Sequence, residues 1–225
     1  MTRVVALVPA RNEADRIAET VRSLADLPCI GEVVVVDDAS SDDTAGIASQ
    51  AGARVLRRTH RSGKGGALEG ALTRLNPADI WLFADADLAG SAGGLRPVLA
   101  AVLEGRTDLA IALVPRAQGG GFGLVRRAAA AAIRALTGFT LGQPLSGQRA
   151  IVGEALAACR PLAAGFGVET GMILDVLRAG FRVLEVPAPG VTHRPTGRTL
   201  RGFVHRGRQG WDIARAVAGR ALRAR

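Results

Sequence analysis

The sequence Ile80-Trp81-Leu82-Phe83-Ala84-Asp85-Ala86-Asp87 places two carboxylates directly after five apolar residues. A short apolar run that ends at polar residues is typical of a strand buried in a sheet. Side chains two residues apart in an extended chain point to the same side, so Asp85 and Asp87 would lie close together. Two like charges in one place are costly unless a cation or ligand hydroxyls neutralise them. Hard carboxylate oxygens favour Mg2+ or Mn2+ as that cation.

Other strand-like runs surround this one in the first half of the chain, and helical patterns separate them. The expected strands are Val4–Val8, Glu32–Val36, Ala53–Leu56, Ile80–Ala84 and Leu109–Val114, with helices at about 13–25, 43–50, 66–75 and 95–104. Regular alternation of strand and helix predicts an α/β fold, with a mostly parallel central sheet flanked by helices. Ligands of such folds bind at the carboxyl ends of the strands, which is where Asp85 and Asp87 stand.

The second half begins near Pro115, where a run of three glycines from Gly119 to Gly121 predicts a flexible loop or lid. The pattern then predicts an alanine-rich helix at about 124–137, a loop at 138–147, helices near 153–160 and 169–179, a strand at 181–186 and a helix at roughly 199–222.

Two more polar segments follow expected strands. Pro9-Ala10-Arg11-Asn12-Glu13 ends the first strand, and Asn12 or Glu13 can cap the helix after it. Asp38 follows the second strand, where a carboxylate can accept hydrogen bonds from a base or a ribose. Asp38 can equally be a helix cap, and Asp42 or Asp43 is more simply a cap or a dipole partner.

The segment Arg61-Ser62-Gly63-Lys64-Gly65-Gly66 is a glycine-rich turn that enters a helix and holds the only lysine of the chain. Free backbone N–H groups together with one compact ammonium would suit a diphosphate. A solvated glycine turn is the alternative interpretation. The turn is not a P-loop, because that motif needs a glycine where Arg58 stands.

Composition limits the function classes. The chain has 225 residues and a net charge of +9, but residues 192–225 hold nine arginines against one acid, so the rest carries only about +1. The two cysteines are far apart in the sequence, which disfavours a disulfide framework. No apolar run approaches the roughly 20 residues of a membrane span, and the first residues resemble a strand rather than a signal peptide. We therefore expect a cytoplasmic protein. No nucleic-acid partner is expected, since the basic segment has few aromatics and no recognisable binding module.

The basic C-terminal segment places apolar residues at near-helical spacing: Leu200, Phe203, Trp211, Ala214, Val217 and Leu222. Three interpretations stay open for it. It can be a solvated basic helix, an anchor to an anionic membrane surface, or a clamp on a phosphorylated acceptor.

The order PARNE, VDDASSDDT, GKGGAL and DAD resembles nucleotide-sugar glycosyltransferases of the GT-A fold, family 2, over about residues 3–115. The resemblance implies a GT-A (Rossmann-like) domain at 1–198, divided into a nucleotide-sugar-binding half (1–115) and an acceptor-side half (116–198). A basic amphipathic helix at 199–225 follows it. The implied nucleotide-sugar contacts are Pro9, Ala10, Arg11, Asn12, Glu13, Asp38, Lys64, Asp85 and Ala86. Asp85 and Asp87 would bind Mg2+ or Mn2+, and Asp87 would be catalytic.

The second half resembles two groups of these enzymes. Ser146-Gly147-Gln148-Arg149 is similar to a loop of polyprenyl-phosphate glycosyltransferases, which implies acceptor contacts at Ser146 and Gln148 and a catalytic role for Arg149. Gly167-Val168-Glu169, the run from Gly190 to Arg194, and Arg208-Gln209 look like retaining glucosyl-3-phosphoglycerate synthases. That second likeness implies a metal ligand at His193, a sugar or catalytic contact at Glu169 and an acceptor contact at Arg194. A purely structural role for His193 stays open.

These patterns together predict a metal-dependent glycosyltransferase that uses a nucleoside-diphosphate sugar and a phosphate-bearing acceptor. Polyprenyl phosphate is the first expectation for the acceptor, and the protein would then bind peripherally at the inner face of the membrane. A homodimer is a further expectation. The alternative is a retaining enzyme with a small soluble phosphorylated acceptor. A sugar nucleotidyltransferase is disfavoured because Pro9-Ala10-Arg11-Asn12-Glu13 replaces the glycine loop such enzymes carry after the first strand. A basic nucleic-acid-binding protein would leave the paired carboxylates without a purpose.

Overall fold

The computed structural model describes residues 2–115, 123–193 and 210–220. Within those ranges, seven strands form one sheet in the order β3-β2-β1-β4-β6-β5-β7. The strands are β1 (Val4–Ala10), β2 (Ile30–Asp37), β3 (Arg54–Arg57), β4 (Ile80–Phe83), β5 (Leu109–Leu113), β6 (Arg149–Val152) and β7 (Val183–Pro187). Every neighbouring pair is parallel except the two that involve β6. The predicted α/β architecture with a mostly parallel sheet is confirmed.

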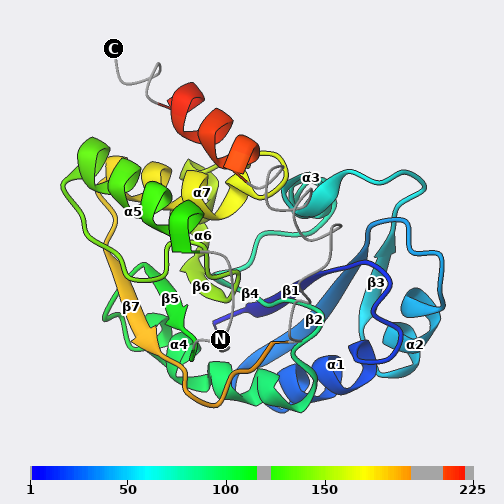
Figure 1. Cartoon of the computed structure of the whole chain (residues 1–225). Coiled ribbons are helices and arrows are strands. Elements are labelled where there is room, and N and C mark those ends of the chain that lie inside the picture. The colour runs from blue at the N-terminus through cyan, green and yellow to red at the C-terminus, as the bar shows by residue number, and fades with distance from the viewer. Residues whose placement is uncertain (1, 116–122, 194–209, 221–225) are drawn as a thin grey trace.

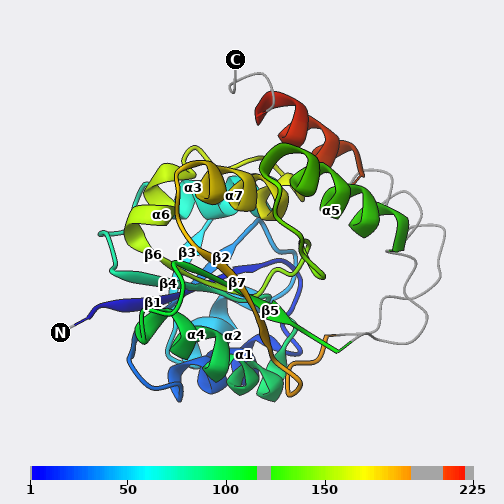
Figure 2. The ribbon, with the colours of Figure 1, turned by 90° about the vertical axis from the view of Figure 1, so that its left-hand side faces the viewer.

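Helices cover both faces of the sheet. They are α1 (Ile17–Ala25), α2 (Thr44–Gln50), α3 (Gly63–Leu72), η1 (Ala89–Leu95, a 3-10 helix), α4 (Arg96–Leu103), α5 (Gly123–Thr137), α6 (Gly153–Ala158) and α7 (Gly167–Arg178). Figures 1 and 2 show α1, α2 and α4 on one face, and α3, α6 and α7 on the other.

The strand β1 shows why both faces must be covered. Alternate side chains of a strand point to opposite faces. Ala6 and Val8 accordingly enter the core beneath α1 and α4, while Val5 and Leu7 enter the core beneath α3 and α7. All four are at most 1% exposed, as expected of a strand that reads as a continuous apolar run in a parallel sheet.

The direction of the chain reverses across the sheet between β1 and β4. From β1 the chain proceeds through β2 to β3 on one side, and it then returns to place β4 on the other side of β1. The residues that follow β1 and β4 therefore leave the sheet at the same edge, on either side of this switch point. Open α/β sheets bind their ligands at such a point.

The strand β6 was not predicted. Residues Arg149–Val152 insert between β4 and β5 and run antiparallel to both. Sequence patterns place these residues after a Gly/Pro loop, and a four-residue strand that begins with arginine has no distinctive periodicity. The helix α3 also begins at Gly63 rather than near 66, so Lys64 lies in its first turn. The expectation that Asn12 or Glu13 caps α1 is wrong, because α1 begins after Arg16.

Residues 210–220 are helical and are drawn in red above α7 in Figure 1. The rest of the helix predicted at 199–222, and the glycine run from Gly119 to Gly121, lie outside the described residues. The predicted apolar face is wrong for Trp211, which is 66% exposed, and for Ala214, which is also exposed. Ile213, Ala216 and Arg220 are the buried side chains, because the helix packs on α7 through that face.

The helices in the described ranges include none whose length and apolarity would let it cross a membrane.

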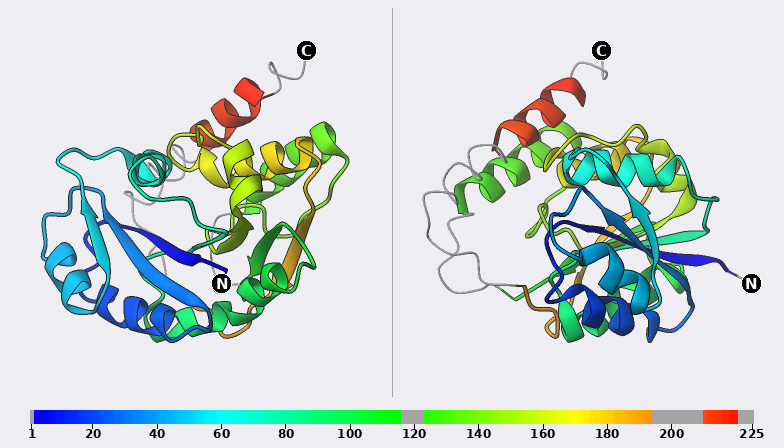
Figure 3. Two further views of the ribbon diagram at one scale, coloured as in Figure 1. Left: turned by 180° about the vertical axis from the view of Figure 1, so that it is seen from behind. Right: turned by 90° about the vertical axis from the view of Figure 1, so that its right-hand side faces the viewer.

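Gly65 allows α3 to approach the segment between α6 and α7. A Cβ at this position would overlap the carbonyl oxygen of Ala163, and that obstacle is main chain, which cannot swing away as a side-chain tip could. Figure 3 shows the two segments from further directions.

Gly65→Ala is therefore expected to lower the free energy of unfolding by about 1–3 kcal/mol, the usual cost of overpacking. Urea denaturation measures the effect. The matched control is Gly123→Ala at the start of α5, where a Cβ comes within 4 Å of no atom in the described part of the chain; alanine should be neutral or slightly stabilising there. Equal stability of the two variants would contradict the packing.

Candidate active site

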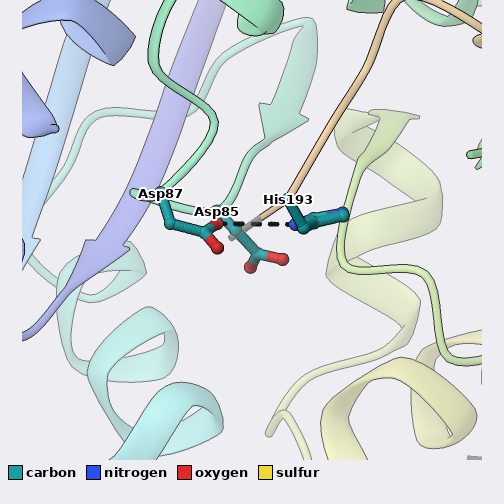
Figure 4. Close-up of side chains that lie close together, drawn as sticks. All are labelled: Asp85, Asp87 and His193. Carbon is teal, nitrogen blue, oxygen red and sulfur yellow. Dashed lines mark hydrogen bonds and ion pairs between the residues drawn. The ribbon is translucent and has the colours of Figure 1, made fainter. Parts of the chain in front are cut away.

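Asp85, Asp87 and His193 come together beyond the carboxyl end of β4. Each offers one ligand atom, and these atoms all lie within 4.8 Å of one another. Figure 4 shows a dashed line from Asp87 to the imidazole of His193, with the carboxylate of Asp85 beside them. The Nδ1 atom of His193 is 3.4 Å from Oδ1 of Asp87. The structure thus gathers the three residues predicted as metal ligands, two from one loop and one from more than a hundred residues further along the chain.

The helix α1 fixes the loop that carries both aspartates. The buried hydroxyl of Thr20 donates to the carbonyl of Ala86 and accepts from the amide of Ala89, both at 2.8 Å. The guanidinium of Arg16 donates to the carbonyl of Asp87 at 3.2 Å. Sequence analysis missed both residues, because their role depends on main-chain atoms about seventy positions away.

The helix η1 fixes the segment that carries His193. The hydroxyl of Ser91 donates to the carbonyl of Thr192 at 3.0 Å and accepts from the amide of Thr192 at 3.1 Å. Val191 is fully buried beside Gly94. These contacts fix the main chain next to His193, and so they place its imidazole beside the two aspartates.

The charges around His193 favour its protonated form. Burial of the imidazole opposes protonation, but the hydrogen bond that the imidazole donates to Asp87 and the charges of Asp85 and Asp87 outweigh it and raise the pKa of His193. Those same two carboxylates and one imidazole form a donor set that suits Mn2+ or Mg2+. A divalent cation bound here would replace the proton on His193 as the positive charge next to the two carboxylates. The residues present therefore fit such an ion.

Lys64 links this cluster to a third carboxylate. Its Nζ atom lies 2.6 Å from Oδ1 of Asp85 and 2.8 Å from Oε1 of Glu169. Burial alone would lower the pKa of Lys64, but the two carboxylate charges outweigh it and raise the pKa above its ordinary value. Desolvation alone would raise the pKa of Asp85, but the charge and hydrogen bond of Lys64, the charge of His193 and the hydrogen bond from Gln148 together lower it.

Gln148 completes the surroundings of Asp85. Its Nε2 atom donates to Oδ2 of Asp85 at 2.6 Å, and the hydroxyl of Ser146 lies 3.4 Å from Oε1 of Gln148. Between them, Gly147 comes so close that an added Cβ would overlap Nζ of Lys64 and lie 2.7 Å from Oδ2 of Asp85. A side chain at position 147 would therefore displace the Lys64–Asp85 pair from the position it has here. Sequence analysis quoted Gly147 in a motif and gave it no role.

Arg149, predicted as catalytic, is almost fully buried and bonds to main-chain oxygens. Its guanidinium donates to the carbonyls of Ser146 and Pro144 at 2.8 Å and of Glu169 at 2.6 Å. Burial lowers its pKa to about 10. The observed contacts tie the loop before β6 to the first turn of α7, which positions Gln148 and Glu169.

The expectation of free backbone N–H groups in the glycine turn is wrong for three residues. Asp38 accepts from the amides of Ser62 and Gly63, both at 2.8 Å, and from the Ser62 hydroxyl at 2.9 Å. The amide of Gly65 donates to the carbonyl of Gly165 at 3.2 Å. Asp38 thus caps α3, which is one of its two predicted roles, although on a different helix from the one that follows it in sequence. Its contact with a base or a ribose stays a prediction.

The segments after β1 and β2 interlock at the same edge of the sheet. Oδ1 of Asn12 accepts from the amide of Ser41 at 2.8 Å, and the amide of Glu13 donates to the hydroxyl of Thr44 at 2.9 Å. Asn12 itself has a left-handed backbone with φ of 56°. Arg11 and Asn12 are exposed at this edge. Their contacts with a nucleotide stay a prediction.

A pocket adjoins the Lys64 cluster. Residues from β1, α3, the end of β4, the loop before β6, the start of β6 and α7 line it: Pro9, Lys64, Leu68, Phe83, Ala84, Gly147, Arg149, Val168, Glu169 and Met172. Ala10 and Ala86 are buried instead, in the core beneath α1. Arg194, together with Arg208 and Gln209, lies outside the described residues.

Comparison with known proteins gives this geometry a context. Residues 5–156 match the sequence family Glycosyl transferase family 2. Glucosyl-3-phosphoglycerate synthase of Mycobacterium tuberculosis (strain ATCC 25618 / H37Rv) is 36% identical over 194 residues, which are 75% of this chain and 59% of the relative. Glycosyltransferase AglJ of Haloferax volcanii is 29% identical over 188 residues, 82% of this chain and 61% of the relative. The chain therefore spans about three fifths of the length of these curated relatives.

Solved structures show the same similarity over more of the chain. The Mycobacterium tuberculosis glucosyl-3-phosphoglycerate synthase bound to Mn2+, UDP and glucosyl-3-phosphoglycerate has a TM-score of 0.81 and 29% identity, covering 97% of this chain and 80% of that one. The complex with Mn2+, UDP-glucose and glycerol 3-phosphate has a TM-score of 0.80 and 29% identity, with the same coverage. The complex with Mg2+ and UDP has a TM-score of 0.82 and 30% identity, covering 97% of this chain and 79% of that one.

Asp87→Asn tests the cation site directly, because it keeps the shape of the side chain and removes its charge. Loss of groups that merely support a metal ligand costs about 10- to 100-fold in metal affinity, so loss of a charged ligand should weaken Mn2+ binding at least about 10-fold. Electron paramagnetic resonance of free Mn2+ measures the affinity, with and without UDP. Asp26→Asn, an exposed carboxylate at the end of α1, is the control. Equal affinity of Asp87→Asn and the control would contradict the site.

Proposed function

The chain belongs to glycosyl transferase family 2, and from that membership we propose that it transfers a sugar from a nucleoside-diphosphate sugar to a phosphate-bearing acceptor. The observation that carries the proposal is the convergence of Asp85, Asp87 and His193 within 4.8 Å at the switch point of the sheet. Nucleotide ligands of α/β folds bind at that place.

The position of two carboxylates fits a reaction that needs a metal. Asp85 and Asp87 lie side by side at the place where a diphosphate would bind. Without a cation, their negative charges would repel its phosphates. A divalent cation reverses that repulsion, since a bound ion is the largest local charge in such a site.

Each residue has a role that follows from its position. We assign Asp85, Asp87 and His193 as the residues that hold Mn2+ or Mg2+, which supplies a Lewis acid for the departing diphosphate. Lys64 adds a positive charge beside the leaving group, where charge grows as the glycosidic bond breaks. Glu169 orients Lys64 through their 2.8 Å ion pair and offers its second oxygen to the sugar.

For the substrates we propose UDP-glucose and a small phosphorylated acid. The Mycobacterium tuberculosis enzyme binds UDP-glucose together with phosphoglyceric acid or glycerol 3-phosphate in its crystal structures. These relatives favour the alternative stated from the sequence, a small soluble phosphorylated acceptor, over polyprenyl phosphate. A membrane surface, a cytoplasmic location and a homodimer stay predictions.

A transfer assay decides between the acceptors. UDP-glucose and GDP-mannose are each incubated with the protein, with Mn2+ or EDTA, and with 3-phosphoglycerate, glycerol 3-phosphate or a polyprenyl phosphate in detergent micelles. Mass spectrometry should detect glucosylated 3-phosphoglycerate only in the reactions that contain Mn2+. A product formed on the polyprenyl phosphate alone would restore the first expectation. Transfer to none of the acceptors would count against the proposed function.

Lys64→Met tests the electrostatic role of the ammonium. Because removing one group that stabilises developing charge costs about 10²–10³ in rate, kcat should fall by that factor. Lys64→Arg is the matched comparison, since it keeps the charge and should lose less. The rate is measured from UDP release at saturating UDP-glucose. A kcat within about twofold of the wild type for Lys64→Met would refute the assigned role.

A further inference from the structure

The helix at 210–220 is docked on α7 by close main-chain packing. Gly167 and Gly171 lie one turn apart on the face of α7 that meets it. A Cβ at Gly167 would lie 2.7 Å from the carbonyl oxygen of Asp212 and 2.8 Å from Cβ of Ala216, and one at Gly171 would lie 2.7 Å from Cζ of Arg220. The two glycines therefore allow this helix to pack closely against α7.

An ion pair secures the far end of the docked helix. Nε and Nη2 of Arg220 donate to Oδ2 of Asp175 on α7 at 2.7 and 2.5 Å. In return, Arg178 of α7 donates to the carbonyl of Arg220 at 2.6 Å. Arg220 is only 7% exposed, so this arginine of the basic segment serves the packing of the helix.

Asp212 secures the near end, at the start of α7. Its Oδ2 atom accepts from the amide of Phe166, the residue that precedes α7, at 3.2 Å. Its carboxylate also lies so close to Gly165 that no Cβ would fit between them. A carboxylate at a helix N-terminus is favoured by the helix dipole and by the unpaired amides of the first turn. Asp212 is the one acid in the segment 192–225.

The segment 160–166 carries the effect of this contact to α3. The carbonyl of Gly165 accepts from the amide of Gly65, next to Lys64. Further along α3, Glu69 accepts from the side chain of Arg160 at 2.8 Å and from the amide of Leu162 at 3.0 Å. The segment between α6 and α7 is thus fastened to α3 on one side and to Asp212 on the other.

We propose that the helix at 210–220 is a clamp that holds the first turns of α3 and α7 together, and that Asp212 is its positioning residue. Lys64 stands in the first turn of α3 and Glu169 in the first turn of α7, and their side chains meet at 2.8 Å. The clamp sets that spacing. Its effect on turnover rests on the proposed function, whereas its effect on the geometry does not.

The clamp predicts a separation between turnover and metal binding. The main chain of the Asp85–Asp87 loop is held by α1, and that of the His193 segment by η1, and neither helix contacts the clamp in the interactions described above. The clamp reaches the metal ligands only through the contact of Lys64 with Asp85. Loosening the clamp should therefore disturb the Lys64–Glu169 pair and lower turnover much more than the affinity for Mn2+. A general loss of structure would lower both together.

Asp212→Ala is the test variant, with Arg215→Ala as the control on the exposed face of the same helix. Hydrogen exchange measured by mass spectrometry should become faster in Asp212→Ala at 63–66 and 163–169 and stay unchanged over β1 and β4. In the transfer assay kcat should fall about 10- to 100-fold, the cost of a small misplacement of reacting groups. Mn2+ affinity should fall by much less, no more than about twofold.

Two further variants separate positioning from simple destabilisation. Asp212→Asn keeps an oxygen that accepts from the Phe166 amide, and asparagine caps helices as well as aspartate does, so it should stay within about threefold of the wild type in kcat. Gly167→Ala attacks the same contact from α7 and should reproduce the exchange pattern. Combined with Asp212→Ala, its effect should be less than additive, because both changes release one contact.

Three results would overturn the clamp. Exchange that changes only within 210–220 would show that the helix does not reach α3. A fall in Mn2+ affinity parallel to kcat, or exchange that rises across the whole sheet, would show a general loss of stability. If the wild type transfers no sugar, the proposed function fails, while the exchange experiment on Asp212→Ala still decides whether the clamp exists.

Discussion

The repulsion between Asp85 and Asp87 is the constraint on which the rest of the site depends. Two carboxylates held side by side at the end of a buried strand are costly unless positive groups surround them. The chain supplies Lys64 to one of them and His193 to the other, at 2.6 and 3.4 Å. The main chain of the loop is fixed from α1, which keeps the two aspartates next to each other. The site is in this way prepared for a divalent cation.

Much of the fold and the cluster could be predicted because local signals carried them. Apolar runs that end in Asp38 and Asp85 identify strands and place their carboxylates at the carboxyl edge of the sheet. The position of His193 rested on a resemblance alone, since no local pattern brings a residue near 190 to β4. Contacts with main-chain atoms could not be predicted from the sequence, for example the hydrogen bonds of Thr20 and Arg149 to carbonyl oxygens.

The second half of the chain shows the same limit more strongly. The strand β6 is stabilised by its two neighbours and not by its own four residues, so its sequence holds little sign of it. The basic segment was interpreted through its charge, yet Arg220 is buried in an ion pair and Asp212 caps α7. The glycines of the Lys64 turn and of α7 were similarly more informative about close packing than about ligands. Net charge alone does not reveal which charged residues are used internally.

The most direct test of the account is a crystal structure of the protein grown with Mn2+ and UDP, measured at a wavelength where manganese scatters anomalously. The account predicts one strong anomalous peak bounded by the side chains of Asp85, Asp87 and His193, in contact with the diphosphate of UDP. A manganese peak bound by other residues, or UDP bound at the sheet edge with no metal between these three side chains, would contradict it.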